Sequence, residues 1–455
     1  MQEYRRPSSF SAWASLAVAL VLVCALPAQE KSSGKTGQRA KETKMTDVFT
    51  RYWDPTPVTP ATPPRPIQPV RKALSMQKAQ PGPPVVLRRY VNDRRNSRAG
   101  GSLDVSPNAV MDVRWKAELR DGLYPSAVLA AGDRIVVHGP SLWMLLDTDG
   151  RTVASGPLGA SELFLDPAHT MFFGANVAGL ITGYNLSNGK RVFDVSLNYG
   201  GQYERPLLAR HDRLLLAVGV KRDVDPHGPP PEESSIEVLN LGDPAAPRNW
   251  DQEGGPQPVN DLKAATRGLK AALTDEEVML ATRDRIFLAN WNMDLLRAFT
   301  GDFSPVEIAL DEAGNIYLTV ARPGRQSLWL VTPQGELVYS FDLPPGVELS
   351  GLPVVVGYDH TAYLLAGRQI LSIAPDGKLN WMRATEGQIA GAAATYDDLL
   401  LVSEGDSLTA WDAQGQRRVL YRFTGEQLAA APALIGDGDL LLATQTRLYR
   451  LSRRR

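Results

Sequence analysis

The chain has 455 residues, of which 22% are charged and 43% are hydrophobic. This length suits one large domain with extensions, and the lack of a long apolar run after the first 29 residues excludes a protein with several membrane spans. The formal charge of −1 hides an asymmetry. Residues 31–98 hold 15 Lys and Arg against four acidic residues, whereas residues 99–455 hold 32 against 44, so a basic segment precedes an acidic one.

The N-terminal segment has the pattern of a secretory signal peptide. Arg5 and Arg6 precede an apolar run over residues 12–26, and small residues stand at its exit. At about 15 residues, this run is shorter than the roughly 20 that a membrane-spanning helix needs. We therefore predict that residues 1–29 are a cleaved signal, with an uncleaved anchor as the alternative.

Cys24 is the one cysteine of the chain and lies inside this run. It is a candidate for lipidation, although Val23 is bulkier than the small residue that precedes the cysteine in bacterial lipoprotein signals. The sequence leaves cleavage, lipidation and retention of the N-terminus as alternatives. After Cys24 there is no cysteine, so the rest of the chain offers no disulfide, thiolate nucleophile or cysteine metal site.

Residues 30–110 have the composition of an unstructured, basic, proline-rich linker. Between Asp54 and Pro69 a proline stands at nearly every second or third position, which favours extended polyproline II and prevents regular pairing. We interpret this segment as a tether. The alternative is a basic arm that contacts an anionic surface such as lipid or a cell-wall polymer. Nucleic acid is the least expected partner of an exported chain.

From Trp143 onward one phrase recurs: an apolar strand, a turn that is usually closed by glycine, and a second strand. The turn glycines are Gly150, Gly189, Gly242, Gly335, Gly377 and Gly415. Their spacings are 39, 53, 93, 42 and 38 residues, and the longest fits two repeats with one degenerate turn at 292–294. A period of this size built from short strands predicts a β-propeller with four strands per blade.

Residues 111–455 are predicted to form this propeller. The first unit has strands at 127–130, 134–137, 141–146 and 151–154, and similar sets begin near residues 162, 206, 272, 306, 353, 392 and 430. The last set stops at Arg455 without a fourth strand, and residues 112–119 have strand character. We predict an all-β, eight-bladed propeller whose last blade is completed by this N-terminal strand. Seven blades are the alternative if the degenerate unit is irregular.

The repeats resemble those of the quinoprotein-like family, in which a strand leads into Leu-Asp-x-x-x-Gly-Lys-x-x-Trp. Similar stretches occur at 374–381, 411–419 and 184–193, and the resemblance covers residues 112–455. It implies the blade architecture, with two outcomes for function. Some members are quinone-dependent dehydrogenases, and others are exported scaffolds without a cofactor, such as the propeller lipoprotein of the bacterial outer-membrane assembly machine.

The dehydrogenase branch, as the resemblance describes it, uses calcium, an orthoquinone and in many members a vicinal disulfide. This chain has no Cys-Cys pair, and the turn from Asp147 to Asp149 offers too few oxygens for a cation that takes six to eight. We interpret that turn as a hairpin closed by Gly150. The sequence therefore predicts no cofactor and no metal site.

Other catalytic motifs are absent from the sequence. The histidines are His138, His169, His211, His227 and His360, and none has zinc-site spacing. Nucleophile-elbow and phosphate-loop patterns do not occur. Tryptophans recur at the third or fourth strand of a unit, where packing between sheets is the expected role: Trp115, Trp143, Trp329, Trp381 and Trp411. A propeller can gather carboxylates from distant blades, so an enzyme such as a lyase or glycosidase stays an alternative.

Strand order predicts two faces for the disc. In an antiparallel blade, the second-to-third turns share one face with the links between blades. The sequence places two long insertions there, at 220–235 and 251–268, and long loops are often functional. Arginines follow the same turns: Arg222, Arg283, Arg322, Arg325, Arg368 and Arg447. They are either solvated turn charges or a rim that binds an anionic ligand or an acidic partner.

The sequence favours a non-catalytic function. We predict an exported propeller in the periplasm or cell envelope that scaffolds protein partners. Binding of an anionic glycan or small ligand at the central channel is the second hypothesis, and a propeller enzyme is the third.

Overall fold

The computed structural model describes residues 65–66, 68–69 and 110–454, with short gaps. The gaps are at 132, 158–161, 167–170, 176–179, 197–207, 211–212, 219–233, 241–256, 265–269, 274–276, 291–294, 312, 396 and 436–438. The described residues fall in the second of two compact units, residues 57–455, and they contain strands but no helix. The predicted signal, Cys24, Arg222 and the degenerate turn at 292–294 lie outside the described residues.

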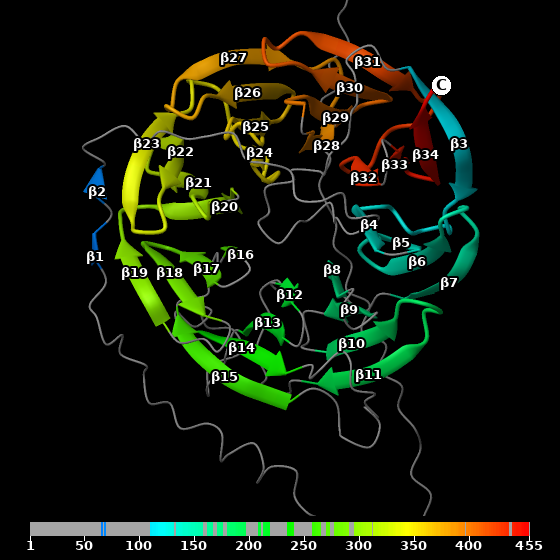
Figure 1. Cartoon of the computed structure of the whole chain (residues 1–455), viewed down its shortest axis with the longest axis horizontal. Coiled ribbons are helices and arrows are strands. Elements are labelled where there is room, and N and C mark those ends of the chain that lie inside the picture. The colour runs from blue at the N-terminus through cyan, green and yellow to red at the C-terminus, as the bar shows by residue number, and fades with distance from the viewer. Residues whose placement is uncertain are drawn as a thin grey trace, which may run out of the picture. The chain divides into compact units, whose positions relative to one another are not determined.

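The described strands form eight sheets with four antiparallel strands each, and two of these sheets have a fifth, parallel strand at the outer edge (Figure 1). We call the strands of each sheet A to D from the inside outward. Sheet 1 is β4 (Ala127–Ala131), β5 (Arg134–His138), β6 (Leu142–Asp147) and β7 (Thr152–Pro157). Sheet 2 is β8 (Glu162–Asp166), β9 (Met171–Ala175), β10 (Leu180–Asn185) and β11 (Arg191–Ser196). Sheet 3 is β12 (Leu208–Arg210), β13 (Arg213–Val218), β14 (Ser234–Asn240) and β15 (Gln257–Ala264).

The remaining sheets follow in chain order. Sheet 4 is β16 (Lys270–Leu273), β17 (Glu277–Thr282), β18 (Arg285–Asn290) and β19 (Leu295–Thr300). Sheet 5 is β20 (Ser304–Leu310), β21 (Ile316–Arg322), β22 (Arg325–Val331) and β23 (Glu336–Asp342). Sheet 6 is β24 (Val355–Val356), β25 (Ala362–Ala366), β26 (Gln369–Ile373) and β27 (Leu379–Ala384). Sheet 7 is β28 (Ile389–Ala394), β29 (Leu400–Glu404), β30 (Ser407–Trp411) and β31 (Arg417–Arg422).

Sheet 8 is closed by the N-terminal strand, as the sequence predicted. It contains β32 (Ala433–Ile435), β33 (Asp439–Ala443) and β34 (Arg447–Arg453), and β3 (Met111–Glu118) supplies strand D. The β3 strand pairs antiparallel with β34, from Met111 opposite Arg453 to Glu118 opposite Arg447. The N–H of Arg454 also donates to the Val110 carbonyl at 2.8 Å. This pairing joins the two ends of the propeller within one sheet and so closes the ring.

The sheets are arranged radially (Figure 1), which confirms the predicted all-β propeller fold. Neighbouring sheets contact one another through their inner strands, for example β16 with β20 and β32 with β4. Strands D follow one another head to tail around the perimeter in the figure. The central strands are covered on both faces, so they are nearly continuous apolar runs, whereas strands D such as β7 are mostly exposed.

Glycine in the C–D turn is required because the neighbouring sheet packs against it. Gly415 has a φ of +73°, and a Cβ there would lie 2.7 Å from the Trp381 ring of sheet 6. The Trp381 Nε1–H donates to the Ala413 carbonyl of the same turn at 3.0 Å. The same packing recurs as Trp115 on Gly150, Phe299 on Gly335 and Tyr339 on Gly377. The predicted inter-sheet role is confirmed for the buried tryptophans Trp143, Trp329, Trp381 and Trp411.

Carboxylates in these turns bond to the backbone. One Asp147 oxygen accepts the N–H of Asp149 at 3.0 Å and that of Arg151 at 2.8 Å. An Asp412 oxygen accepts the N–H groups of Gln414 and Gln416 in the same way. An aspartate that begins a turn therefore satisfies turn donors, in agreement with the hairpin interpretation of the turn at Asp147.

Two expectations are corrected by the strand assignments. Residues 257–264, which we expected within a D–A connection at 251–268, form strand D of sheet 3 and pair with β14. The connection at 241–256 therefore leaves on the C–D side, opposite the B–C connection at 219–233. In the linker that we predicted to be unstructured, β1 (Arg65–Pro66) and β2 (Gln68–Pro69) pair in parallel with β19 and β23. Proline is tolerated at such an outer edge because only one side of the strand is paired.

Candidate functional site

The described arginines of the predicted rim all lie at B–C connections. Arg283 lies between β17 and β18, and Arg368 between β25 and β26. Arg322 and Arg325 flank the β21–β22 turn, and Arg447 begins β34. Because B–C connections share one side of a propeller, the topology places these residues on one face, which we call the B–C face. Their environments decide whether this face can accept an anion.

On sheet 5 the arginines share one carboxylate. Arg322 lies 3.5 Å and Arg325 3.3 Å from the oxygens of Asp342, at the end of strand D. The Ser327 hydroxyl donates to the same carboxylate, and the Arg322 guanidinium lies 5.2 Å from the centre of the Trp329 ring. Asp342 and the ring therefore balance the positive charge at this turn.

On sheet 8 a similar cluster surrounds Arg447. Its Nε–H donates to Glu118 at 2.6 Å, and its Nη1–H donates to Glu426. The hydroxyls of Thr444 and Tyr449 also donate to Glu426, each at 2.6 Å. Burial opposes ionisation of Glu426, but these hydrogen bonds outweigh it and lower the pKa of the carboxyl. Burial and the bond to Glu426 raise the pKa of Tyr449 to about 12.

At the junction of sheets 6 and 7, the arginines donate to backbone carbonyls and to a buried glutamate. Arg368 donates to the carbonyls of Thr385 and Glu386. The fully buried side chain of Glu404 accepts the N–H of Glu386 at 3.0 Å and the Nε–H of Arg417 at 2.7 Å. Arg417 also bridges to the Glu386 carboxylate at 2.8 Å. Each charge in this group therefore has a partner within the protein.

These contacts define what the predicted rim can do. Arg322, Arg325, Arg368 and Arg447 bond to acceptors of the chain itself, and Arg283, Arg325 and Arg368 are exposed. At Arg322, Arg325 and Arg447 a bound anion would have to replace existing ion pairs. Four of the five described arginines on the B–C face therefore already have acceptors within the chain, and the six-arginine site stays a prediction. The acidic partners were missed because they lie 17 to 329 residues away in sequence.

A buried histidine–aspartate pair lies on the opposite side, at the A–B turns of sheets 5 and 6. His360 Nδ1 lies 3.0 Å from Asp311 Oδ2, and both side chains are buried. Asn315 donates to that oxygen at 2.8 Å, and the Tyr317 hydroxyl donates to the His360 carbonyl. His360 has a φ of +64°, in the left-handed region. The pair therefore fixes two turns to each other.

Four of the eight inner strands contain no charged residue. Strands A of sheets 1, 6, 7 and 8 read AVLAA, VV, IAGAAA and ALI, without a charged residue. Between sheets 4 and 5, Lys270 Nζ lies 3.0 Å from Glu307. Within the part of the chain that the structure describes, no three His, Cys, Asp or Glu side chains gather as metal ligands. Sheets 1, 6, 7 and 8 therefore offer no carboxylate from their inner strands, whereas the inner strands of sheets 2 to 5 read ELFLD, LAR, KAAL and SPVEIAL.

Comparison with known proteins identifies the fold. No family model and no curated protein matches the sequence. Solved structures do match: BamB from Moraxella catarrhalis has a TM-score of 0.54 at 13% identity and is covered over 98% of its length by 76% of this chain. The chain has the PQQ-like β-propeller fold. At 13% identity, the likeness to BamB shows the fold alone.

Dehydrogenases have the same fold. A europium-containing methanol dehydrogenase matches with a TM-score of 0.56 at 10% identity, over 80% of this chain and 97% of that one. A quinohemoprotein alcohol dehydrogenase from Pseudomonas putida matches with a TM-score of 0.56 at 9% identity, over 79% of each chain. At these identities the likeness extends to the fold and not to the chemistry.

In the described residues, no helix is long and apolar enough to cross a membrane.

Proposed function

We propose that this chain is an exported, non-catalytic propeller that holds protein partners together at the cell envelope. The observation that carries the proposal is the chemistry of the inner strands. Four of them present only Ala, Val, Leu, Ile and Gly, where a cofactor-dependent propeller needs polar donors. A function built on this fold then lies at its surface, and the match over 98% of BamB supports the scaffold branch.

The envelope location is proposed from the sequence. The basic residues and short apolar run of the first 29 residues have the signal-peptide pattern. A basic, proline-rich linker would then separate the exported globule from the membrane. Its partners are envelope or secreted proteins, and an anionic surface is a further contact for the linker.

Affinity capture of the full chain from detergent-solubilised envelopes tests the proposal. Two variants, shortened within 219–233 and within 241–256, leave every described strand intact. Because these connections leave on opposite sides of sheet 3, a partner that is lost with only one variant identifies the face that it contacts. Recovery of the chain in the cytosolic fraction, or no enriched protein with any form, would refute the scaffold.

The second candidate, binding of an anionic glycan or small ligand, is favoured by one observation, the exposed Arg283 on the B–C face. Glycan-array binding that is lost with Arg283→Ala, together with no captured protein, would favour it over the scaffold.

A further inference from the structure

The outer edges of this propeller accept an extended segment, and the chain itself provides the example. Arg65 and Pro66 pair in parallel with Phe299 and Thr300, the last two residues of β19. Gln68 and Pro69 pair in parallel with the first two residues of β23. One residue separates these strands, so five residues cross from sheet 4 to sheet 5. Strand addition of this kind uses backbone hydrogen bonds for affinity and side chains for specificity.

Charge distinguishes the edge that the chain covers. The strands β19 and β23 carry Arg297, Glu336 and Asp342, a formal balance of −1. The segment that crosses them contains Arg65 and no acidic residue. A basic segment thus lies on an edge that is slightly acidic, as complementary electrostatics would select.

The corresponding edge of sheets 6 and 7 has the opposite charge. Its strands, β27 and β31, hold four arginines and no acidic residue: Arg383, Arg417, Arg418 and Arg422. The positions that correspond to those paired with β1 and β2 are the end of β27, with Arg383, and the start of β31, with Arg417 and Arg418. We call these two strands the β27–β31 edge.

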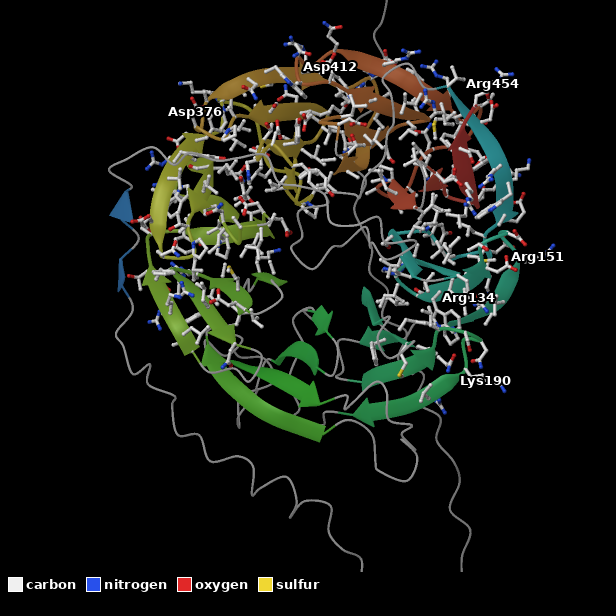
Figure 2. All side chains as sticks on the ribbon, viewed as in Figure 1. Arg134, Arg151, Lys190, Asp376, Asp412 and Arg454 are labelled. Carbon is white, nitrogen blue, oxygen red and sulfur yellow. The ribbon has the colours of Figure 1, made fainter. Side chains whose placement is uncertain are left out.

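Three of these arginines are exposed and one is not. Arg417 is 18% exposed and bonded to Glu386, and Arg422, although exposed, lies 3.6 Å from the same carboxylate. Arg383 and Arg418 are exposed at the crossing point, although the Arg383 Nη1–H donates to the Met382 carbonyl at 3.0 Å and Arg418 also has a contact within the chain. Figure 2 shows Asp412, in the turn that precedes β31, at the outer perimeter where β27 and β31 meet. Among the described strands, none pairs with the outer side of either strand.

Exposed apolar side chains accompany these arginines. Leu379 and Met382 on β27 are 40% and 37% exposed, and Val419 on β31 is 37% exposed. Charged residues alone are a common protection of an edge strand against aggregation. Large apolar side chains on the same edge work against such protection, whereas a partner strand would bury them. The combination therefore indicates an edge that is covered by a partner in use.

We propose that the β27–β31 edge binds an extended acidic segment of a partner protein, which adds as a fifth strand across sheets 6 and 7. Its carboxylates lie opposite Arg383 and Arg418, and its apolar residues cover Leu379, Met382 and Val419. This inference rests on the proposed scaffold function and names the surface and the chemistry of the partner.

Selection from a random 12-residue peptide library on the full chain tests the proposal. The enriched peptides are expected to combine Asp or Glu with β-branched residues. Their binding, followed by fluorescence anisotropy, is expected to weaken at least tenfold with Arg383→Glu/Arg418→Glu and to weaken with salt. The control is Arg120→Glu/Arg151→Glu, which reverses two exposed arginines near sheets 8 and 1 and leaves the affinity unchanged.

A covalent readout keeps the test decisive if the charge reversal disturbs folding. In a chain in which Ser replaces Cys24, Ala384→Cys introduces a single thiol at the end of β27. A selected peptide that carries a cysteine is expected to form a disulfide with the Ala384→Cys chain and not with a Ser155→Cys chain, whose thiol lies on β7. Enrichment of basic or purely apolar peptides, equal affinity for the charge-reversed chain, or no enrichment would overturn the proposal.

The result can be separated from the scaffold proposal. If envelope proteins are captured equally by the wild-type and the charge-reversed chain, the scaffold stands and this edge is not its binding surface. If no envelope protein is captured by any form, the scaffold fails whatever the peptides do.

Discussion

Replacement of Gly415 by Ala measures how strongly the sheets depend on their turn glycines. The φ of +73° costs an L-residue about 1 kcal/mol. The new Cβ would also lie 2.7 Å from Trp381 Cδ2 and 2.8 Å from its Cγ, so the ring must move within a packed junction. Overpacking of this kind costs about 1–3 kcal/mol. We therefore expect Gly415→Ala to lower the free energy of unfolding by about 2–4 kcal/mol.

Gly367 is the matched control. Its φ is +63°, and no atom lies within 4 Å of the Cβ that alanine would add. Gly367→Ala therefore carries the backbone cost alone, about 1 kcal/mol. The difference between the two substitutions isolates the contact with the tryptophan. In a Trp381→Leu background that difference is expected to shrink, because the ring face is gone.

Equilibrium unfolding of the full chain in urea, followed by tryptophan fluorescence, gives the free energies at a common slope. If Gly415→Ala and Gly367→Ala shift the urea midpoint equally, Gly415 is required only for its positive φ. Such a result would refute the claim that contact with the Trp381 ring requires glycine at this position. If the Trp381→Leu background leaves the difference unchanged, some neighbour other than the ring causes the cost.

Titratable and buried groups give three further tests. Burial lowers the pKa of His138 to about 4, so the unfolded chain binds a proton that the folded chain does not between pH 6.5 and 4. Stability should fall across that window by about 3 kcal/mol, and urea midpoints of His138→Leu should lose this slope. The lowered pKa of Glu426 stabilises the fold above pH 4.5, and this contribution is lost as the pH falls through the folded pKa. Glu426→Gln should thus cost about 1 kcal/mol at neutral pH and progressively less in acid. Asp311→Ala, which removes the acceptor of His360 and Asn315, should cost about 2–3 kcal/mol, more than Asp359→Ala in the same urea assay.

The sequence predicted those strands of the fold that are buried, because burial requires a recognisable run of apolar residues. The inner strands are apolar on both faces, so the strands of sheet 1 agree with the predicted ranges to within three residues. The closing strand β3 could be predicted because the last repeat contains three strands and lacks a fourth. Strand β15 was missed because a D strand at the outer edge reads QPVNDLKA, which has no apolar run.

The candidate site was predictable only in part. Arginines at B–C turns follow from strand order, and their placement on one face needs no side-chain information. Their partners do not follow, because Glu118 and Arg447 are brought together by closure of the ring across 329 residues. The same reason hid Asp311 and His360, which belong to different sheets. Pairing between sheets is a tertiary property, and a single repeat carries no signal for it.

The degenerate repeat shows what the C–D junction requires in physical terms. In the junctions before sheets 1 and 7, a Trp115 or Trp381 Nε1–H caps the second carbonyl of the turn. In the junction before sheet 5 the equivalent carbonyl, that of Pro333, accepts a bond from Arg297 Nη1 at 2.9 Å. Phe299, two residues later, packs against the turn glycine in place of the indole. One tryptophan thus performs two tasks that an arginine and a phenylalanine divide here, and the junction keeps its hydrogen bond and its aromatic contact.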